Sequence, residues 1–441
     1  DDATFLQATG IDLTADGNLM DRTGNLDLSV ADLRLDGADI HPPPTAIALK
    51  ARLDGDRLDD VALHLSAGAT TFTLSGSADN LTTQPVLDGV ISLKSQLAQV
   101  TSIFNLAGDY DGSLDAELTL KGRLENPDAG LILSVGAGHI AGQPLDRGDV
   151  ALDLHDRQIT LSKAAWRLAD GAVQLNGTLN LREAFPTGLL VPPTDVDAIT
   201  YDLALRQEIP RLAPWLERFI DIQGRAGGRL SLSGKGITPE AISATLTLDT
   251  AGRELIAPSM DRPVEAGVDL SARMEDGQIT VSRLEAFSDG LDLSGDGRFQ
   301  WQDRKLAGNL RMTADDLSRA LAVVGLGTVS GAVDATLTAD GSLNQPQFSL
   351  GLTAKNLNVD AYSLGNLTVD AAMDPEGRLQ LTTLRLTNQA SRIQGSGRIR
   401  LLPGGRIDPD FENALTLNLE KLSADHFMAM APVDGTLDGR L

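Results

Sequence analysis

Residues 331–346 have the sequence GAVDATLTADGSLNQP, which is the most informative stretch for the fold. Val333, Ala335 and Leu337 alternate with Asp and Thr, so successive side chains of an extended strand would point to opposite faces. A glycine stands near each end and a proline follows, as is typical of strand boundaries. The stretch therefore predicts a half-buried β-strand with one apolar and one polar face.

This pattern recurs along the chain. Its spacing is a Gly, nine residues, a second Gly, four residues and a Pro, and it occurs at Gly112, Gly122 and Pro127, at Gly224, Gly234 and Pro239, and at Gly331, Gly341 and Pro346, with Gly435 beginning a further copy. A second pattern is a hairpin that ends in a Gly nineteen residues after a polar start: Arg57 to Gly76, Gln158 to Gly177, Gln278 to Gly297, and Arg378 to Gly397. The two patterns interleave at a period of about 100 to 120 residues, which predicts an internally repeated fold.

Asp-Gly dipeptides separate the alternating segments. Asp-Gly supplies the positive φ angles of tight hairpin turns, so a long antiparallel meander is expected. The predicted turns are at Asp16-Gly17, Asp36-Gly37, Asp54-Gly55, Asp111-Gly112, Asp170-Gly171, Asp276-Gly277, Asp289-Gly290 and Asp340-Gly341.

Each repeat also contains one short segment with apolar residues at helical spacing. The segments are Leu97–Leu106, Pro210–Ile220, Leu317–Leu326 and Leu422–Met430. If the helix with Trp215 and Phe219 caps or locally plugs a groove formed by the strands, we expect it to be amphipathic, with both rings inward. The predicted units are a partial first repeat at 1–95, complete repeats at 96–208, 209–316 and 317–421, and a truncated fifth repeat at 422–441. This division predicts that the chain is a segment of a longer protein.

Composition narrows the possible functions. Hydrophobic residues make up 42% of the chain but aromatic residues only 4%, so the apolar surface is mostly aliphatic. The net charge of −24, with no cluster of Lys and Arg, makes nucleic acid an improbable partner. Absence of cysteine excludes disulfides, thiolate metal sites and a Cys nucleophile, and is compatible with an oxidising, extracytoplasmic compartment. No stretch of about 18 to 20 apolar residues is present, so any membrane anchor is expected outside this sequence.

A search for catalytic or metal-binding patterns favours a non-enzymatic protein without cofactor or metal. No two of the five histidines have the i, i+4 spacing of a zinc-binding helix. The run 109–115 resembles the start of a calcium loop, but position twelve is Leu120, where a Glu is needed, so a turn entering a strand is favoured. Ser363 lacks the first Gly of a nucleophile elbow. Adjacent acids are expected to be solvated in a chain with 61 of them.

An antiparallel sheet with one apolar face must cover that face in some way. The predicted fold class is mainly β: a long antiparallel repeat array that folds over itself into a trough, with a few short helices. Aliphatic walls with few aromatic residues suit acyl chains better than sugars. The alternative is that the same residues form an ordinary packed core. The candidate wall residues are Leu114, Ala116, Leu118, Leu120, Val173, Leu175, Leu230, Leu232, Leu291, Leu293, Val333, Ala335 and Leu337.

The residue pattern of the repeats resembles that of the TamB and AsmA-like family of Gram-negative envelope proteins, which are bridge-like lipid transfer proteins. The resemblance covers nearly the whole chain, and it is carried by residues 331–346, by LGLTAKNLNV at 350–359 and by RIQGSGRIRL at 392–401. It implies a periplasmic protein anchored in the inner membrane, whose folded β-sheet (a β-taco) encloses an apolar groove. It also implies phospholipid transport toward the outer membrane, assistance in outer-membrane protein assembly with a barrel assembly protein as partner, or both. The family supplies no catalytic residues.

Three hypotheses remain open from the sequence. The first is a lipid conduit that moves phospholipid acyl chains along the groove. The second is a structural or adhesive β-repeat protein with a filled interior. The third, a carbohydrate-active β-helix enzyme, is disfavoured because aromatic platforms and convergent catalytic groups are lacking.

Overall fold

The computed structural model describes most of the chain. The described residues are 5–18, 20–36, 43–103, 109–140, 143–168, 171–209, 222–256, 262–322, 329–343, 345–359, 362–389, 391–402, 406–408, 410–423 and 436–440. They form two compact units, Asp1–Glu208 with Ser233–Ile237, and Ile209–Leu232 with Thr238–Leu441. Each unit is described by itself.

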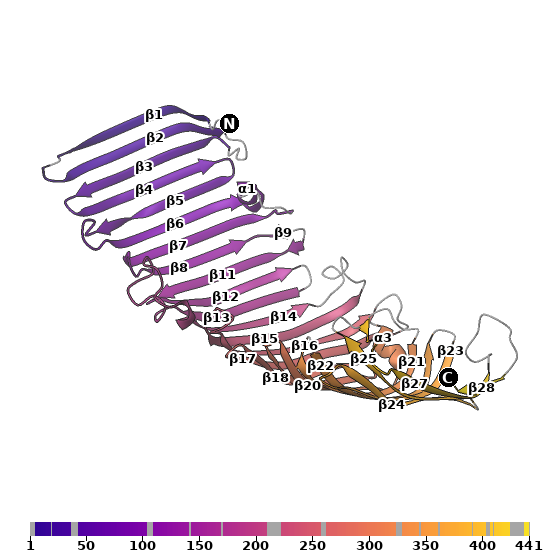
Figure 1. Cartoon of the computed structure of the whole chain (residues 1–441). Helices are drawn as coiled ribbons and strands as arrows, with labels where there is room; N and C mark the ends of the chain where they lie inside the picture. The colour runs from indigo at the N-terminus through magenta and orange to yellow at the C-terminus, as the bar shows by residue number, and fades with distance from the viewer. Residues whose placement is uncertain are drawn as a thin grey trace. The chain divides into compact units, whose positions relative to one another are not determined.

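The first unit is a ladder of long strands in chain order (Figure 1). Its strands are β1 (Phe5–Asn18), β2 (Thr23–Asp36), β3 (Thr45–Asp54), β4 (Arg57–Ala67), β5 (Thr70–Asp79), β6 (Val86–Gln96), β7 (Ser113–Arg123), β8 (Asp128–Val135), β11 (Arg147–His155), β12 (Gln158–Leu168), β13 (Gly171–Asn180) and β14 (Thr200–Ile209). A small separate ladder joins β9 (Gly138–Ile140) to β10 (Gln143–Leu145). The unit also holds α1 (Leu97–Ile103) and the one-turn helix η1 (Val196–Ala198).

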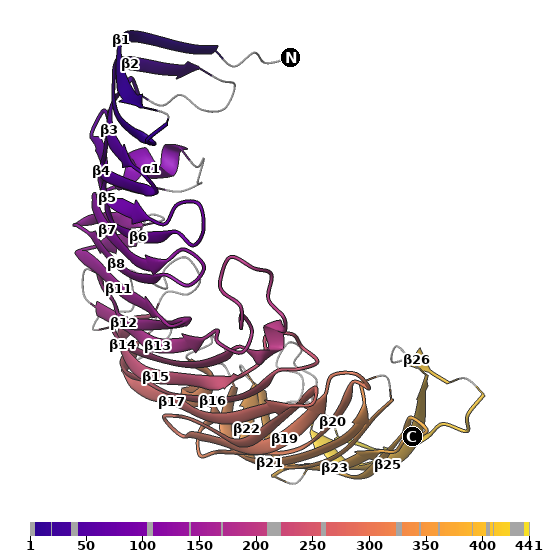
Figure 2. The same cartoon turned by 90° about the vertical axis from the view of Figure 1, so that its left-hand side faces the viewer.

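The second unit has the same construction, and its strands are visibly curved (Figure 2). Its strands are β15 (Gln223–Lys235), β16 (Ser243–Ile256), β17 (Val264–Glu275), β18 (Gln278–Ser288), β19 (Leu291–Gln300), β20 (Lys305–Ala314), β21 (Val329–Ser342), β22 (Gln345–Val359), β23 (Tyr362–Met373), β24 (Arg378–Asn388), β25 (Ser391–Leu402), β26 (Arg406–Ile407), β27 (Ala414–Ser423) and β28 (Thr436–Arg440). Its described helix is α3 (Leu317–Ala322). The chain is therefore mainly β, a long antiparallel array with a few short helices, as the sequence predicts.

The predicted Asp-Gly turns have mixed outcomes. Asp276 and Gly277 form a two-residue hairpin turn with φ of 51° and 69°, the geometry that suits the twist of flanking strands. Two predicted turns are wrong, because Asp16-Gly17 lies inside β1 and Asp340-Gly341 inside β21. The pairing of β1 with β2 continues through Asp16 and Gly17, so the ladder overrides the local turn preference.

The repeat predicted from glycine spacing is visible in the strand registers. Gly177, Gly297 and Gly397 lie opposite Leu161, Val281 and Leu381, and in all three hairpins the next pair begins three residues later on the first strand. Two residues of the first strand thus oppose one residue of the second at each place, which is a β-bulge. In the hairpin that contains Gly76, the same irregularity falls between Leu58 and Val61. A bulge bends its strand and increases the local twist, so these hairpins introduce curvature at regular intervals.

The first glycine of the other pattern also has one geometry in three repeats. Gly112, Gly224 and Gly331 have φ of 112°, 131° and 124°. A Cβ at Gly331 would lie 2.8 Å from the carbonyl oxygens of both Lys355 and Asn356, and the other two glycines meet the neighbouring strand in the same way. Glycine is needed at these positions for two reasons. Other residues rarely adopt this φ angle, and a side chain would collide with the backbone oxygens. Gly435 lies outside the described residues.

Two of the four predicted helices are confirmed. α1 and α3 begin at Leu97 and Leu317, as predicted, and each precedes the first glycine of a repeat. The candidate Pro210–Ile220, with Trp215 and Phe219, lies outside the described residues. The fourth candidate is wrong at its start, since Leu422 and Ser423 end β27, and its remainder is not described. Among the described residues, no helix has both the length and the apolar character needed to cross a membrane.

Candidate functional site

One face of the first unit carries an unbroken file of paired aliphatic residues. Partners in an antiparallel ladder point to the same face, so the registers trace this file from strand to strand. In order from β1 to β12 it contains Leu13, Leu28, Leu49, Leu63, Leu74, Ile91, Leu118, Leu131, Leu152 and Leu161. Gly177 on β13 and Leu203 on β14 continue it.

The second unit has an equivalent file. From β16 to β27 it contains Leu248, Leu270, Leu284, Gly295, Leu310, Leu337, Leu350, Ala371, Leu381, Gly397 and Leu415. We call the surface formed in each unit by such a file, with the neighbouring apolar residues on the same side, the apolar face.

The structure places the predicted wall residues on these faces. Leu114, Ala116, Leu118 and Leu120 alternate with exposed or less buried polar residues on β7, and Val173 and Leu175 alternate with polar residues on β13. The residues that pair with one another across β7, β8, β11, β12 and β13 place both sets on one face. In the second unit, Leu291, Leu293, Val333, Ala335 and Leu337 share a face through their partners on β20.

Leu230 and Leu232 are also on the less exposed side of their strand. They flank Ser231 on β15, and the Ser231 hydroxyl lies 2.5 Å from the Thr247 hydroxyl on the exposed side of β16. Adjacent side chains point to opposite faces, so both leucines lie on the side away from this contact.

Most of the apolar face is only half-covered. No member of either file is buried, and Leu13 and Leu415 are 60% and 56% exposed. A filled core would contain large aliphatic side chains that are fully buried. Among the described residues, the large aliphatic side chains that are buried, such as Leu114, Leu145 and Leu255, lie in small clusters outside the two files. Within each unit, the apolar face is therefore an aliphatic surface without a complete cover.

The short helices cover the apolar face locally. Leu97 of α1 packs against the cluster of Leu114, Val135 and Leu145, and Leu317 of α3 is buried with Ala314, Val333 and Ala354. Leu114 and Val333 each follow the first glycine of a repeat by two residues, and each is 7% exposed. The helices thus close the face at equivalent strand ends and leave the strand centres open. Figure 2 shows α1 on one side of its sheet.

The apolar face of the second unit is hollowed where four strands, β18 to β21, meet. Gly295, Gly297 and Gly308 provide no side chains there, and the gap has a volume of about 270 Å³. We call this the glycine hollow, and its aliphatic and aromatic walls are Ile279, Val281, Leu284, Phe299, Leu306, Leu310, Leu337 and Ala339. An engineered apolar cavity of about 150 Å³ is large enough to take up benzene, so this gap can hold part of an acyl chain.

The opposite face is polar and carries cross-strand ion pairs. Arg311 lies 2.9 Å from Asp334 and Arg283 lies 3.3 Å from Asp269. Such exposed pairs contribute little to stability, but they keep this face hydrated. The two faces of each sheet therefore differ sharply in polarity.

Asp149 is the most strongly held carboxylate on the polar face of the first unit. Arg147 donates to it at 3.0 Å and 2.9 Å, Lys163 at 3.0 Å and Ser134 at 3.1 Å. The hydrogen bond from Arg147, followed by that from Lys163, lowers the pKa of Asp149 to about 2, because both favour the charged carboxylate. Arg147 lies on the same strand as Asp149, and Ser134 and Lys163 lie on the two adjacent strands.

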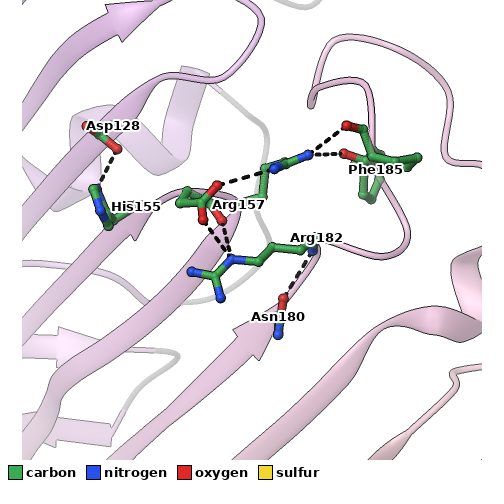
Figure 3. A network of polar contacts seen from close by, with 8 residues as sticks. Asp128, His155, Arg157, Asn180, Arg182 and Phe185 are labelled. Atoms are coloured by element: carbon green, nitrogen blue, oxygen red, sulfur yellow. Dashed lines mark hydrogen bonds and ion pairs between the residues drawn. The ribbon is translucent and has the colours of Figure 1, made fainter.

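A long loop at one edge of the first unit, residues 181–199, is fastened to the neighbouring turn 156–157 (Figure 3). Arg157 donates to the carbonyl oxygens of Phe185 at 3.1 Å and Pro186 at 2.8 Å, and Arg182 forms an ion pair with Asp156 at 3.0 Å. The loop includes the Pro-rich segment 191–193.

The described part of the chain has no group of three or more His, Asp or Glu side chains that could hold a metal ion. Two histidines instead make single carboxylate contacts, His139 with Asp111 at 3.1 Å and His155 with Asp128 at 2.8 Å. The run 109–115 leads through Asp111 and Gly112 into β7, which is the turn entering a strand that the sequence favoured.

Sequence reasoning missed much of the apolar face. Leu13, Leu74 and Leu152 belong to the first file, and Phe299 to the wall of the glycine hollow. Their period-two alternation was available as a signal. The glycine hollow itself has no sequence signature, because it depends on three glycines from two strands meeting across a ladder.

Comparison of the chain with protein-family models, with curated proteins and with solved structures gave no match.

Proposed function

We propose that this chain is a segment of a periplasmic lipid conduit, in which the apolar face carries phospholipid acyl chains between the inner and outer membranes. Aid to outer-membrane protein assembly is a second activity of the same proposal, with a barrel assembly protein as partner. The inner-membrane anchor would belong to sequence outside this chain. No catalytic step is involved.

The observation that carries this proposal is the pair of aliphatic files, whose members are all at least partly exposed. A file that crosses successive strands gives an acyl chain equivalent contacts at each step of about 4.8 Å. Each methylene group removed from water contributes about 0.8 kcal/mol, so such a surface can retain lipid. Since the files contain no polar residue, a chain could slide along them without meeting a charged barrier.

The resemblance to the TamB and AsmA-like family supports the proposed periplasmic location and the proposed transport of phospholipid toward the outer membrane. It rests on the quoted motifs and on the predicted trough. The aliphatic composition of the apolar face agrees with an acyl ligand, since sugar-binding surfaces generally use Trp and Tyr.

The decisive experiment compares the two faces of one strand. Leu337→Asp places a carboxylate in the file, where its desolvation beside acyl chains costs several kcal/mol. The matched control is Thr336→Asp, on the exposed side of β21 and opposite Arg311. In the full-length protein, we expect Leu337→Asp to reduce lipid transfer between vesicles and to reduce copurifying phospholipid measured by mass spectrometry. Thr336→Asp should leave both unchanged.

Circular dichroism must show that both variants are folded. If the folded variants transfer lipid equally well, the apolar face is not the functional surface. Absence of any copurifying lipid from the unsubstituted protein would favour the structural or adhesive alternative, in which the apolar face is covered by protein.

Thr119→Asp, a substitution on the polar side of β7, would be a poorer control for the apolar face than Thr336→Asp. The Thr119 hydroxyl donates to the Gly130 carbonyl oxygen at 3.3 Å, and Thr119 is half-buried. Thr119→Asp would thus perturb a strand contact as well as add a charge.

A further inference from the structure

The glycine hollow ends at an exposed aromatic residue. Phe299 forms part of its wall, and the Phe299 ring meets the Trp301 ring edge to face, with centroids 6.0 Å apart and planes at 86°. Trp301 is 61% exposed, and Leu306, also in the wall, is 39% exposed. The side of the hollow nearest Trp301 therefore carries exposed side chains.

The opposite direction along the same strands is closed. There the apolar face continues to Ala314, Leu317 and Val333, which are only 3%, 8% and 7% exposed beneath α3. A charged group placed at that end would lose its hydration without gaining a partner, at a cost of several kcal/mol. Of the two strand ends, the one toward Trp301 is therefore the end that can hold a polar headgroup.

The turn that begins at Trp301 has the character of a headgroup site. Residues 301–305 are Trp, Gln, Asp, Arg and Lys, all exposed, and the two cations against one acid give a net charge of +1. The whole chain has a net charge of −24, so this turn is locally opposite in sign. Lys305 lies 3.1 Å from Asp303, and Arg304 stands between them in the sequence.

We propose that the glycine hollow binds an anionic, acyl-chain amphiphile in one orientation, with the chain in the hollow and the phosphate beside Trp301 and Arg304. An indole ring prefers the boundary between apolar and polar surroundings, which is its place here. This inference rests on the proposed lipid function and adds a fixed orientation and a preference for anionic headgroups. The hollow would then be a binding site at which a lipid stays longer than elsewhere on the apolar face.

The orientation can be measured by fluorescence quenching in the full chain. The probes are two forms of lysophosphatidylglycerol, brominated near the headgroup or near the chain terminus. The contribution of Trp301 is the difference between the unsubstituted protein and Trp301→Phe, which retains Trp166 and Trp215. We expect at least twofold stronger quenching of Trp301 by the probe brominated near the headgroup.

The charge preference is tested with Arg304→Gln. Loss of one exposed cation should weaken binding of lysophosphatidylglycerol by roughly three- to tenfold and leave binding of an uncharged monoacylglycerol of equal chain length unchanged. Arg311→Gln, on the polar face, is the control and should change neither affinity. Ala339→Phe, which fills the hollow from β21, should abolish the Trp301 quenching in a protein whose circular dichroism is unchanged.

The outcomes separate the two proposals. Equal quenching by both probes, or stronger quenching by the terminally brominated one, would overturn the orientation while lipid binding itself stood. An unchanged affinity in Arg304→Gln would overturn the anionic preference. If neither lipid binds the unsubstituted protein, this inference and the proposed function both fail.

Discussion

Leu310 on β20 and Leu337 on β21 lie directly opposite one another, and both are half-buried although they stand near the middle of their strands. Their neighbours Arg311 and Thr336 form the adjacent pair on the other face. In an ordinary sheet protein, the apolar pair would lie beneath a second layer. Because this pair is incompletely covered, the residues that would bind lipid under the proposed function need not be those that stabilise the fold.

Truncation at the α3 cluster should therefore cost more than truncation in the open file. Leu317→Ala removes a side chain that is 8% exposed and packed against Ala314 and Ala354, and we expect it to lower the free energy of unfolding of its unit by about 2–4 kcal/mol. Leu310→Ala, at a half-buried position, should cost about 1 kcal/mol. Urea denaturation followed by circular dichroism measures both, and the reverse ranking would show that the apolar face is covered by other parts of the protein.

Gly331→Ala should destabilise the junction between β21 and β22. The new Cβ would stand 2.8 Å from two carbonyl oxygens at a φ of 124°, so we expect a loss of roughly 1–3 kcal/mol. Gly351→Ala on β22 is the control, since its Cβ would meet two side-chain oxygens, of Thr336 at 3.2 Å and of Asp370 at 3.8 Å, and no backbone atom within 4 Å. Similar thermal denaturation midpoints for both variants would contradict the structural role assigned to the first glycine of the repeat.

The carboxylate of Asp149 gives a pH-dependent contribution to stability. Its pKa is lowered from 3.8 to about 2, so the contribution is present above pH 3.8 and is lost as the pH falls through about 2. Because these ion pairs are solvent-accessible, the effect at neutral pH is on the order of 1 kcal/mol. Asp149→Asn should therefore unfold more easily than the unsubstituted protein at pH 7, and this difference should shrink as the pH falls toward 2. A difference that persists unchanged at pH 2 would mean that packing, and not charge, explains the loss.

Arg157 should control access to the loop 181–199. Arg157→Ala removes its hydrogen bonds to the carbonyl oxygens of Phe185 and Pro186, and we expect thermolysin to cleave within the loop several-fold faster. Arg157→Lys keeps the charge but lacks the planar fork, so an intermediate rate is expected. Mass spectrometry of the fragments identifies the site, and cleavage at the unsubstituted rate in Arg157→Ala would show that other contacts fix the loop.

Much of the architecture could be predicted because its signals are local. Period-two alternation identifies the face of each strand, as at Val333, Ala335 and Leu337, without reference to the rest of the chain. The Gly-x9-Gly spacing identified equivalent positions, and Gly112, Gly224 and Gly331 do share one backbone geometry. The helices α1 and α3 were predictable from their change to helical spacing.

What the sequence by itself determined is thus the alternation of faces, the repeat, the aliphatic chemistry of the candidate wall and most strand positions. Only the tertiary structure decided that β1 continues through Asp16-Gly17, that Gly295, Gly297 and Gly308 meet in one hollow, and that the apolar face is covered where Leu317 packs on it. The physical reason is that a side chain's direction follows from its own backbone. Its pairing partner and its cover depend on residues tens of positions away, whose registers are set by bulges and long-range packing.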